Sequence, residues 1–422
     1  MNSWKFVSAI LTLSLGFFVF GQSCLTLRPT GILFLPDIIV FPPFVLAIAG
    51  LLLAAVISIA IGGRQKRWVK LGYLFLGFLT LLSLLQGHLF SLYAIREAVF
   101  SQYGIGVWMA FLLAIPASNE KFWVYFQRHF LWLFNLLLCV QIFAILLLMK
   151  GNEGLTRLNF STSVSLFILA AGILRSDKAY FWSGLIGLGL FEMHSFIHDQ
   201  RESFLLPFEF MALFLPVYLF RSFHSQKEKR FNRAMKIISL LYVMIIVAGG
   251  IFFMMSAKYK KAAEMSMLTR DTRSYVVEDY LASEMLEPRN LLLGKGVNGY
   301  YKSSRRTMLG GAGTSDVIEM GYLQMILNVG LLYVLTMFLL GFFPSLKAIF
   351  KSRNPLAAVA GLWILIRLAN MVYMAKPSTS LDWFLFWICI GIVHSTGFPD
   401  IANRRRVQAR RGPLKSSSVS SK

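Results

Sequence analysis

Long apolar runs separated by short polar connectors dominate the pattern of hydrophobic and polar positions along this 422-residue chain. The runs recur at a length of roughly 20 residues, which a helix needs to cross a hydrocarbon core of about 30 Å. The expected spans are residues 4–20, 43–61, 71–85, 104–116, 130–149, 160–174, 181–193, 204–220, 237–256, 320–343, 355–374 and 383–396. We therefore predict an all-α, polytopic membrane protein with about twelve transmembrane helices.

One stretch, residues 257–318, departs from this pattern because it stays polar, charged and punctuated by glycine. It lies between the ninth and tenth expected spans and is long enough to fold outside the bilayer. Within it, apolar residues at helical spacing predict an amphipathic helix over 274–285, which Pro288 ends. This stretch is the first place to look for a functional site.

The composition excludes an ordinary soluble protein. The chain is 56% hydrophobic and only 15% charged, with a mean hydropathy of +0.63. A soluble domain carries charge on about a quarter of its residues. The apolar runs therefore reflect a membrane solvent rather than an unusually large core.

The net charge of +22 does not indicate a nucleic-acid partner, because the basic clusters adjoin apolar runs. Lys and Arg beside transmembrane helices face the cytoplasm under the positive-inside rule. The clusters lie at 64–70, 221–236, 351–354 and 404–415. The rule places both termini in the cytoplasm and 257–318 on the outer side. We expect membrane lipid as the partner of the basic tail.

The chain is therefore predicted to have a simple linear organisation. Residues 1–256 form transmembrane helices one to nine, and 257–318 form one large extracytoplasmic loop. Residues 319–396 form transmembrane helices ten to twelve, and 397–422 form a basic cytoplasmic tail.

Metal or disulfide chemistry is not expected. The cysteines Cys24, Cys139 and Cys389 are scattered and show no ligand or disulfide spacing. His194 and His198 lie four residues apart and could share a helical turn as a metal pair, but no third ligand is evident. A position for His198 near a substrate head group fits this segment better. We predict no metal and no cofactor.

Charged side chains near the ends of membrane spans are costly, so each is a candidate for function. Arg201, Arg273 and Glu319 lie at the expected outer side. Each has a simpler alternative. Arg201 could extend its charge to the interface, Arg273 could pair with a nearby carboxylate, and Glu319 could favour a helix start through the macrodipole. Arg96, on the connector after the third span, could line a substrate path from the opposite side.

The segment LLLGKGVNGYY contains a second candidate. Gly294 and Gly296 permit positive φ on either side of Lys295. Backbone N–H groups in such a turn can face an anion. The alternative is a loop turn with no ligand.

At the level of motifs, the chain resembles the family of O-antigen ligases and Wzy-type polymerases. The likeness rests on the layout of spans, on the late outer loop, and on Arg273 followed by a helix and LLLGKG. It also rests on the loop exit EMGYLQMILNVGLLYVL and on DQRES before the eighth span. The motifs cover residues 194–335, and the earlier spans are similar in layout only.

The resemblance implies a GT-C-like membrane fold in a bacterial cytoplasmic membrane. It implies transfer of a glycan from an undecaprenyl-pyrophosphate carrier to a sugar hydroxyl on the outer face, without a metal. Arg201 and Arg273 correspond to the family's pyrophosphate-binding arginines, a role that suits the guanidinium fork. Gly294, Lys295, Gly296, Tyr322, His198 and Arg96 are then possible contacts of the loop or glycan.

The chain departs from the ligase pattern at Glu319, where ligases carry a histidine before Tyr-Leu. A carboxylate can accept the proton of an attacking hydroxyl as histidine would. The departure favours a polymerase of lipid-linked repeat units, inverting and metal-independent, which a chain-length regulator protein could assist.

Two alternatives stay open. One is a ligase that transfers the glycan to lipid A-core or another terminal acceptor. The other is a transporter or flippase, which the outer position of the long loop and of the candidate charges disfavours.

Overall fold

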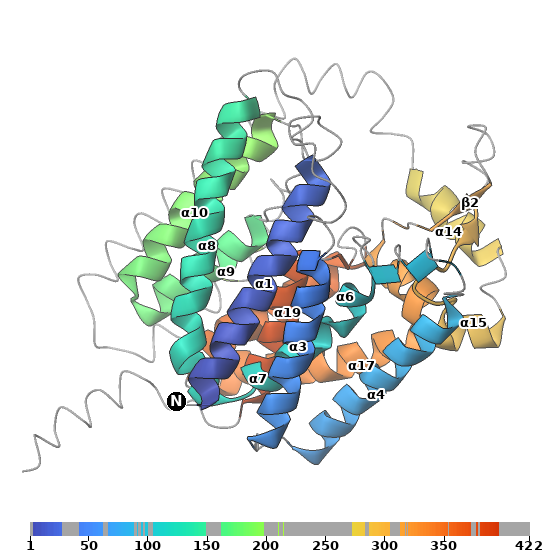
Figure 1. The fold of residues 1–422 in the computed structure, drawn as a ribbon, viewed down its shortest axis with the longest axis horizontal. Helices are drawn as coiled ribbons and strands as arrows, with labels where there is room; N and C mark the ends of the chain where they lie inside the picture. Colours follow the sequence, from blue (N-terminus) through green and yellow to red (C-terminus); the bar gives the residue numbers. More distant parts are fainter. Residues whose placement is uncertain are drawn as a thin grey trace, which may run out of the picture.

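The structure, a computed structural model, is mostly helical in the part of the chain that it describes (Figure 1). The described residues are 3–27, 42–61, 66–87, 91, 94–95, 98–99, 104–148, 162–197, 210, 214, 272–282, 287–303, 313–316, 318, 320–352, 354–372, 377–378 and 380–395.

The described helices follow one another along the chain and include one 3₁₀ segment, η2. They are α1 (Ser3–Leu27), α3 (Pro42–Ala60), α4 (Arg67–Gln86), α6 (Ile105–Trp108), η2 (Met109–Leu113), α7 (Ala114–Ala117), α8 (Glu120–Leu148), α9 (Thr162–Arg175), α10 (Lys178–Ile197), α14 (Thr272–Ala282), α15 (Pro288–Leu293), α17 (Gly321–Lys351), α18 (Pro355–Asn370) and α19 (Leu381–His394). Strands β1 (Tyr301–Lys302) and β2 (Thr314–Ser315) form an antiparallel pair.

Four of these helices are long and apolar enough to cross a membrane, by length and composition. They are Ser3–Gly21, Pro42–Ala60, Arg67–Gln86 and Gly321–Lys351. Shorter apolar helices cover Ile105–Ala117, Val164–Arg175, Pro355–Asn370 and Leu381–His394. The predicted helical architecture with apolar spanning helices is confirmed to this extent. The number of spans and the outer loop stay predictions, and most of 204–220 and all of 237–256 lie outside the described residues.

The structure differs from the sequence prediction around residues 120–129, which we expected as a polar connector. Helix α8 already begins at Glu120. The cause is an aromatic stripe at helical spacing: the Phe122 and Phe126 rings stack with centroids 4.6 Å apart. The indole N–H of Trp123 also donates to the Ala117 carbonyl at 2.7 Å. Burial of this stripe extends the helix beyond its most apolar part.

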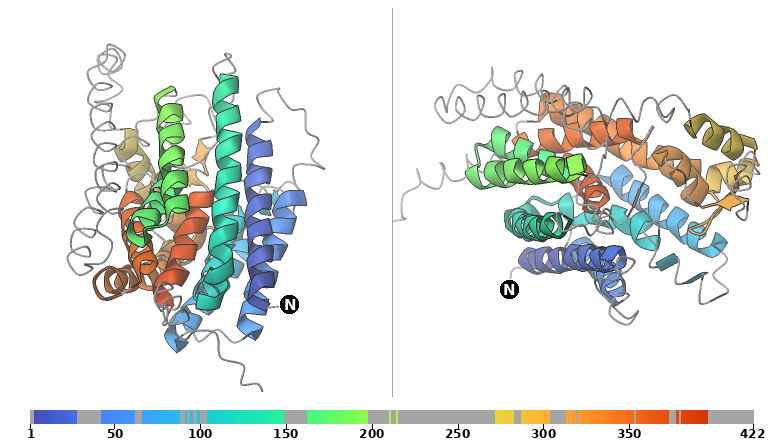
Figure 2. Two further views of the ribbon diagram at one scale, coloured as in Figure 1. Left: turned by 90° about the vertical axis from the view of Figure 1, so that its left-hand side faces the viewer. Right: turned by 90° about the horizontal axis from the view of Figure 1, so that it is seen from above.

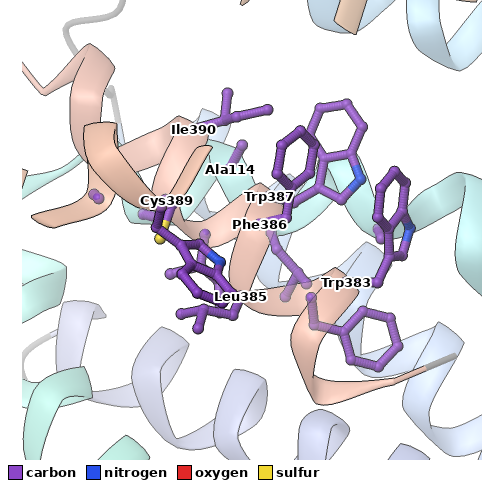
Figure 3. Close-up of a cluster of buried hydrophobic side chains, with 14 of the residues drawn as sticks. Ala114, Trp383, Leu385, Phe386, Trp387, Cys389 and Ile390 are labelled. Atoms are coloured by element: carbon purple, nitrogen blue, oxygen red, sulfur yellow. The ribbon is translucent and has the colours of Figure 1, made fainter. Parts of the chain in front are cut away.

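Helix α19 lies at the centre of the described helices. Every residue from Leu381 to Ile392 is buried. Trp383 donates its indole N–H to the Val107 carbonyl at 2.9 Å, and Figure 3 shows Trp383, Phe386 and Trp387 packed among other apolar side chains. A helix that is apolar on all sides belongs in a protein core, and α19 fits this rule.

Helices α4 and α17 lie side by side and run antiparallel. Gly72, early in α4, faces Leu340 in the second half of α17, whereas Ser83, late in α4, bonds the Asn328 carbonyl in the first half. His394 bonds the Leu340 carbonyl and its ring meets that of Trp68. The end of α19 therefore packs against the start of α4. The basic residues Lys66, Arg67 and Lys70 lie exposed there.

Helices α9 and α10 form a tight antiparallel pair, and the two views of Figure 2 show them beside α8. The turn between them is capped by Asp177, whose carboxylate accepts the Ala179 N–H at 3.1 Å. A Cβ atom added at Gly184 would lie 2.6 Å from the Leu169 Cα atom. The absence of a side chain at Gly184 therefore sets the distance between the two helices.

We predict that Gly184→Ala lowers the free energy of unfolding by about 1–3 kcal/mol, because backbone atoms must move to admit the methyl group. Thermal unfolding of the purified protein in detergent measures the effect. Gly77→Ala is the matched control, since the nearest atom to its added Cβ is Phe111 Cζ at 3.6 Å. Equal melting temperatures for the two variants would contradict the prediction.

Candidate functional site

The candidate site is built on an interruption in helix α17. Gly330 has φ 83° and ψ 166°, far from helical values, so α17 consists of two helical halves. A side chain rarely adopts this φ, and glycine adopts it without steric cost. Backbone groups beside such a break lose partners within the helix and must find others. The sequence predicted a span over 320–343 without indicating this interruption.

The Gly-Lys-Gly turn supplies those partners. The Lys295 N–H donates to the Leu327 carbonyl at 2.7 Å, and the Gly296 N–H donates to the Asn328 carbonyl at 3.2 Å. In return, the Asn328 side-chain amide donates to the carbonyls of Gly296 and Val297, at 3.0 and 3.2 Å. The loop turn and the broken helix thus complete each other's hydrogen bonding.

The backbone donors of the turn are engaged inside the protein. The N–H groups of Lys295 and Gly296 are engaged by α17, and the Gly294 N–H donates to the Asn290 carbonyl at 2.9 Å. The Val297 N–H donates to the Ser83 carbonyl at 3.1 Å. Since these donors are used within the protein, the turn is a packed scaffold, and these four N–H groups are not free to bind an anion.

Both glycines of the turn have the positive φ that the sequence predicted, 77° at Gly294 and 93° at Gly296. They also allow a close approach of backbones. A Cβ atom on Gly294 would lie 2.7 Å from the Asn328 carbonyl carbon, and one on Gly296 would lie 2.6 Å from the Gly87 nitrogen. The turn is therefore wedged between the end of α4 and the break in α17.

The end of helix α4 contacts both the turn and the break in α17. The Ser83 hydroxyl donates to the Asn328 carbonyl at 2.8 Å. The Asn298 amide donates to the carbonyls of Gly87 and Ala94, at 3.1 and 3.2 Å. Figure 1 shows α14, α15 and β2 gathered beside the adjoining ends of α4 and α17.

Gln324 extends the polar contacts along the first half of α17, one helical turn before Asn328. Its amide bonds the Asn328 side chain and the Asp316 carbonyl, and its carbonyl oxygen accepts the Ile318 N–H at 2.6 Å. Gln324 and Asn328 are both fully buried. Residues four apart share one face of a helix, so this buried face holds the segment that leads into α17.

Helix α14 covers the same region. It begins at Thr272, slightly before the predicted 274–285, and its Tyr280 packs against Tyr301 of β1 with ring centroids 6.1 Å apart. Tyr280, Tyr301, Ile318 and Leu327 form a small apolar cluster separate from the main core. Burial raises the pKa of the Tyr280 phenol well above its usual value, so this group stays neutral.

Tyr322 ties the start of α17 to the end of α18. Its N–H donates to the Met371 carbonyl at 3.2 Å, and its hydroxyl donates to the Leu368 carbonyl at 2.7 Å. The last carbonyls of a helix lack partners within it. Tyr322 satisfies two of them.

An ion pair that the sequence analysis did not single out joins α18 to α19. Arg367 in the last turn of α18 meets Asp382 in the first turn of α19, with Nη1 and Oδ2 2.7 Å apart and each side chain 9% exposed. The charge of Arg367 inside the expected span 355–374 is the signal that could have indicated the pair. Asp382 lies in the expected outer connector that follows this span.

The predicted site residues are only partly described. Arg96, His198, Arg201 and Glu319 lie outside the described residues, and for Arg273 only its place in the first turn of α14 is described. The ammonium of Lys295 lies 3.4 Å from the Tyr300 carbonyl oxygen, which it donates to.

The described part of the site therefore consists of the Gly294–Gly296 turn and Tyr322. The turn bonds the first half of α17 at Leu327 and Asn328, and Tyr322 lies in its first turn. Among the described residues, no three His, Cys, Asp or Glu side chains come together where they could hold a metal ion.

Comparison with protein-family models, with curated proteins and with solved structures gave no match to this chain. A proposal for function must therefore rest on the described geometry and on the sequence motifs. The roles that the resemblance implies for Arg201, Arg273 and Glu319 stay predictions.

We predict that Asn328→Ala frees the Gly-Lys-Gly turn, because the Gly296 and Val297 carbonyls would lose their donor. A buried polar group without a partner costs about 1–3 kcal/mol. Hydrogen exchange measured by mass spectrometry should speed up at Lys295 and Gly296. Asn290→Ala is the control, since its side-chain bond to Glu287 is solvent-exposed. Unchanged protection of the turn in Asn328→Ala would refute the proposed docking.

Proposed function

We propose that this protein is a membrane glycosyltransferase that polymerises undecaprenyl-pyrophosphate-linked oligosaccharide units on the outer face of a bacterial cytoplasmic membrane. The observation that carries the proposal is the docking of the described residues 287–303, through Lys295 and Gly296, on the break in an apolar helix of spanning length. This junction suits a substrate with a polyprenyl tail in the bilayer and a charged sugar-bearing head at its surface.

In the proposed reaction the acceptor hydroxyl oxygen attacks the anomeric carbon of the donor sugar from the face opposite the pyrophosphate. The new glycosidic C–O bond forms while the bond from that carbon to the pyrophosphate oxygen breaks, which inverts the configuration. Undecaprenyl pyrophosphate leaves with the bonding electrons, and the hydroxyl proton passes to Glu319 as general base.

Arg201 and Arg273 stabilise the departing pyrophosphate in this proposal. Negative charge grows on its oxygen as the bond breaks, and positioned guanidinium groups are effective against such charge. Helix α14, which carries Arg273 in its first turn, packs through Tyr280 on β1. This contact between Tyr280 and Tyr301 holds α14, and with it the backbone at Arg273, against β1.

The residues of the turn have a different part. Gly294 and Gly296 are scaffold residues, because their contacts and their φ angles are needed for docking on α17. Tyr322 follows Glu319 by three positions. Its two bonds to α18 fix the start of α17, and through it the neighbourhood of the proposed base.

A transporter or flippase is the second candidate, and the break at Gly330 is the observation that favours it. Interrupted helices line the substrate sites of many transporters. In this chain, however, the groups freed at the break are bonded by the loop turn rather than directed to a cavity. The glycosyltransferase therefore accounts for more of the described contacts.

We predict that Arg273→Ala abolishes long-chain polysaccharide in cells and leaves single repeat units attached to the final acceptor. Removal of a charge that stabilises the leaving group should slow transfer by at least roughly 100-fold. Gel separation of the polysaccharide reports chain length. Arg289→Ala is the matched control, since Arg289 is an exposed arginine of α15 in the same loop.

The other outcomes separate the alternatives. Normal ladders in Arg273→Ala would rule out the mechanism above. Complete loss of units from the acceptor would indicate a ligase if lipid-linked chains accumulate on the outer face of the membrane. It would indicate a flippase if single lipid-linked units accumulate on the cytoplasmic side.

A further inference from the structure

The Arg367–Asp382 ion pair is costly where it lies. Both side chains are about nine-tenths buried, and Arg367 Nη1 lies 2.7 Å from Asp382 Oδ2. Within the described part of the chain, Arg367 Nε is buried without a hydrogen bond. Removing two charges from water costs several kcal/mol per ion, and apolar residues of similar volume often stabilise a protein more. Stability alone therefore gives little reason for the pair.

The location of the pair indicates a different role. Arg367 lies in the last turn of α18 and Asp382 in the first turn of α19, where the helix dipoles favour a cation and an anion respectively. The pair therefore fixes the end of α18 against the start of α19. Ser380 caps α19 at this corner by accepting the Trp383 N–H at 3.3 Å.

The fixed end of α18 is the part that holds Tyr322. The Leu368 carbonyl, next to Arg367, accepts the Tyr322 hydroxyl, and the Met371 carbonyl accepts the Tyr322 N–H. Met371 in turn donates its N–H to the Arg367 carbonyl at 3.0 Å. A continuous series of bonds thus runs from Asp382 through Arg367 and the end of α18 to the first turn of α17.

Direct binding of a substrate anion by Arg367 fits these observations less well. Asp382 already compensates its charge, and a phosphate would have to compete with that carboxylate at 2.7 Å. The unbonded Nε atom is also buried rather than presented to solvent. The contacts run to the backbone that holds Tyr322, which indicates positioning.

We propose that Arg367 and Asp382 are a positioning pair that holds the first turn of α17, with Tyr322, in register for glycan transfer. This inference rests on the proposed function for its catalytic consequence. Its structural consequence, the immobility of Tyr322, is independent of that function. The two consequences can be measured separately.

The test compares Arg367→Gln, Arg367→Lys and Asp382→Asn with the reversed pair Arg367→Asp, Asp382→Arg. Arg175→Gln is the control, since it removes another partly buried arginine that bonds Gln127. Hydrogen exchange by mass spectrometry follows peptides around Tyr322 and Met371. Turnover of a lipid-linked oligosaccharide by the protein in phospholipid vesicles gives kcat and KM.

We expect faster exchange at Tyr322 in Arg367→Gln and Asp382→Asn, but not in Arg175→Gln. We also expect kcat to fall by roughly 10- to 100-fold, the effect of a small misplacement of reacting groups. KM for the donor should change by less than about threefold. The pair does not contact the donor, so its loss should weaken the transition state and leave substrate binding nearly unchanged. Arg367→Lys and the reversed pair should recover part of both losses.

Two results would overturn the proposal. Unchanged exchange at Tyr322 would show that the pair does not hold α17, and a raised donor KM with unchanged kcat would make Arg367 a substrate ligand. If the unmodified protein transfers no glycan, the proposed function fails, and the exchange measurement still decides the positioning role. If Arg367→Gln does not fold, Arg367→Lys and the reversed pair carry the same comparison.

Discussion

The hydrogen bonds across the break in α17 are the constraint on which the described part of the loop depends. Once Gly330 leaves the helical conformation, nearby carbonyls need donors in surroundings where water is scarce. The N–H groups of Lys295 and Gly296 are these donors, and the Asn328 side chain in turn donates to the Gly296 carbonyl. Helix α15, the β1–β2 pair and α14 are then arranged around an attachment that neither the loop nor α17 could complete alone.

The sequence predicted what depends on local pattern. Apolar runs gave the helices, and the amphipathic spacing after Arg273 gave α14. The same reasoning was wrong at 120–129, where the interior aromatic stripe of Phe122 and Phe126 outweighed the polar residues between them. Charge and hydropathy averaged over a segment conceal a stripe of this kind, and only the position of each residue around the helix reveals it.

The site was less predictable because its parts meet only through tertiary packing. Positive φ at Gly294 and Gly296 followed from the residue type, but the partner of the turn, Asn328, lies 32 residues beyond Gly296. A glycine within an apolar run gave no indication that it would adopt φ 83°. Likewise, Arg367 and Asp382 become a pair only when α18 packs on α19, and each taken alone resembles a charge near a helix end.

The central place of α19 also bears on how the protein is assembled. Its described neighbours η2, α7, α9, α17 and α18 all precede it along the chain and so leave the ribosome first. Either these neighbours stay loosely packed until α19 is synthesised, or they separate again to admit a helix whose Trp383 and Trp387 are fully buried. Contacts of these neighbours with α19 can therefore form only after α19 itself has been synthesised.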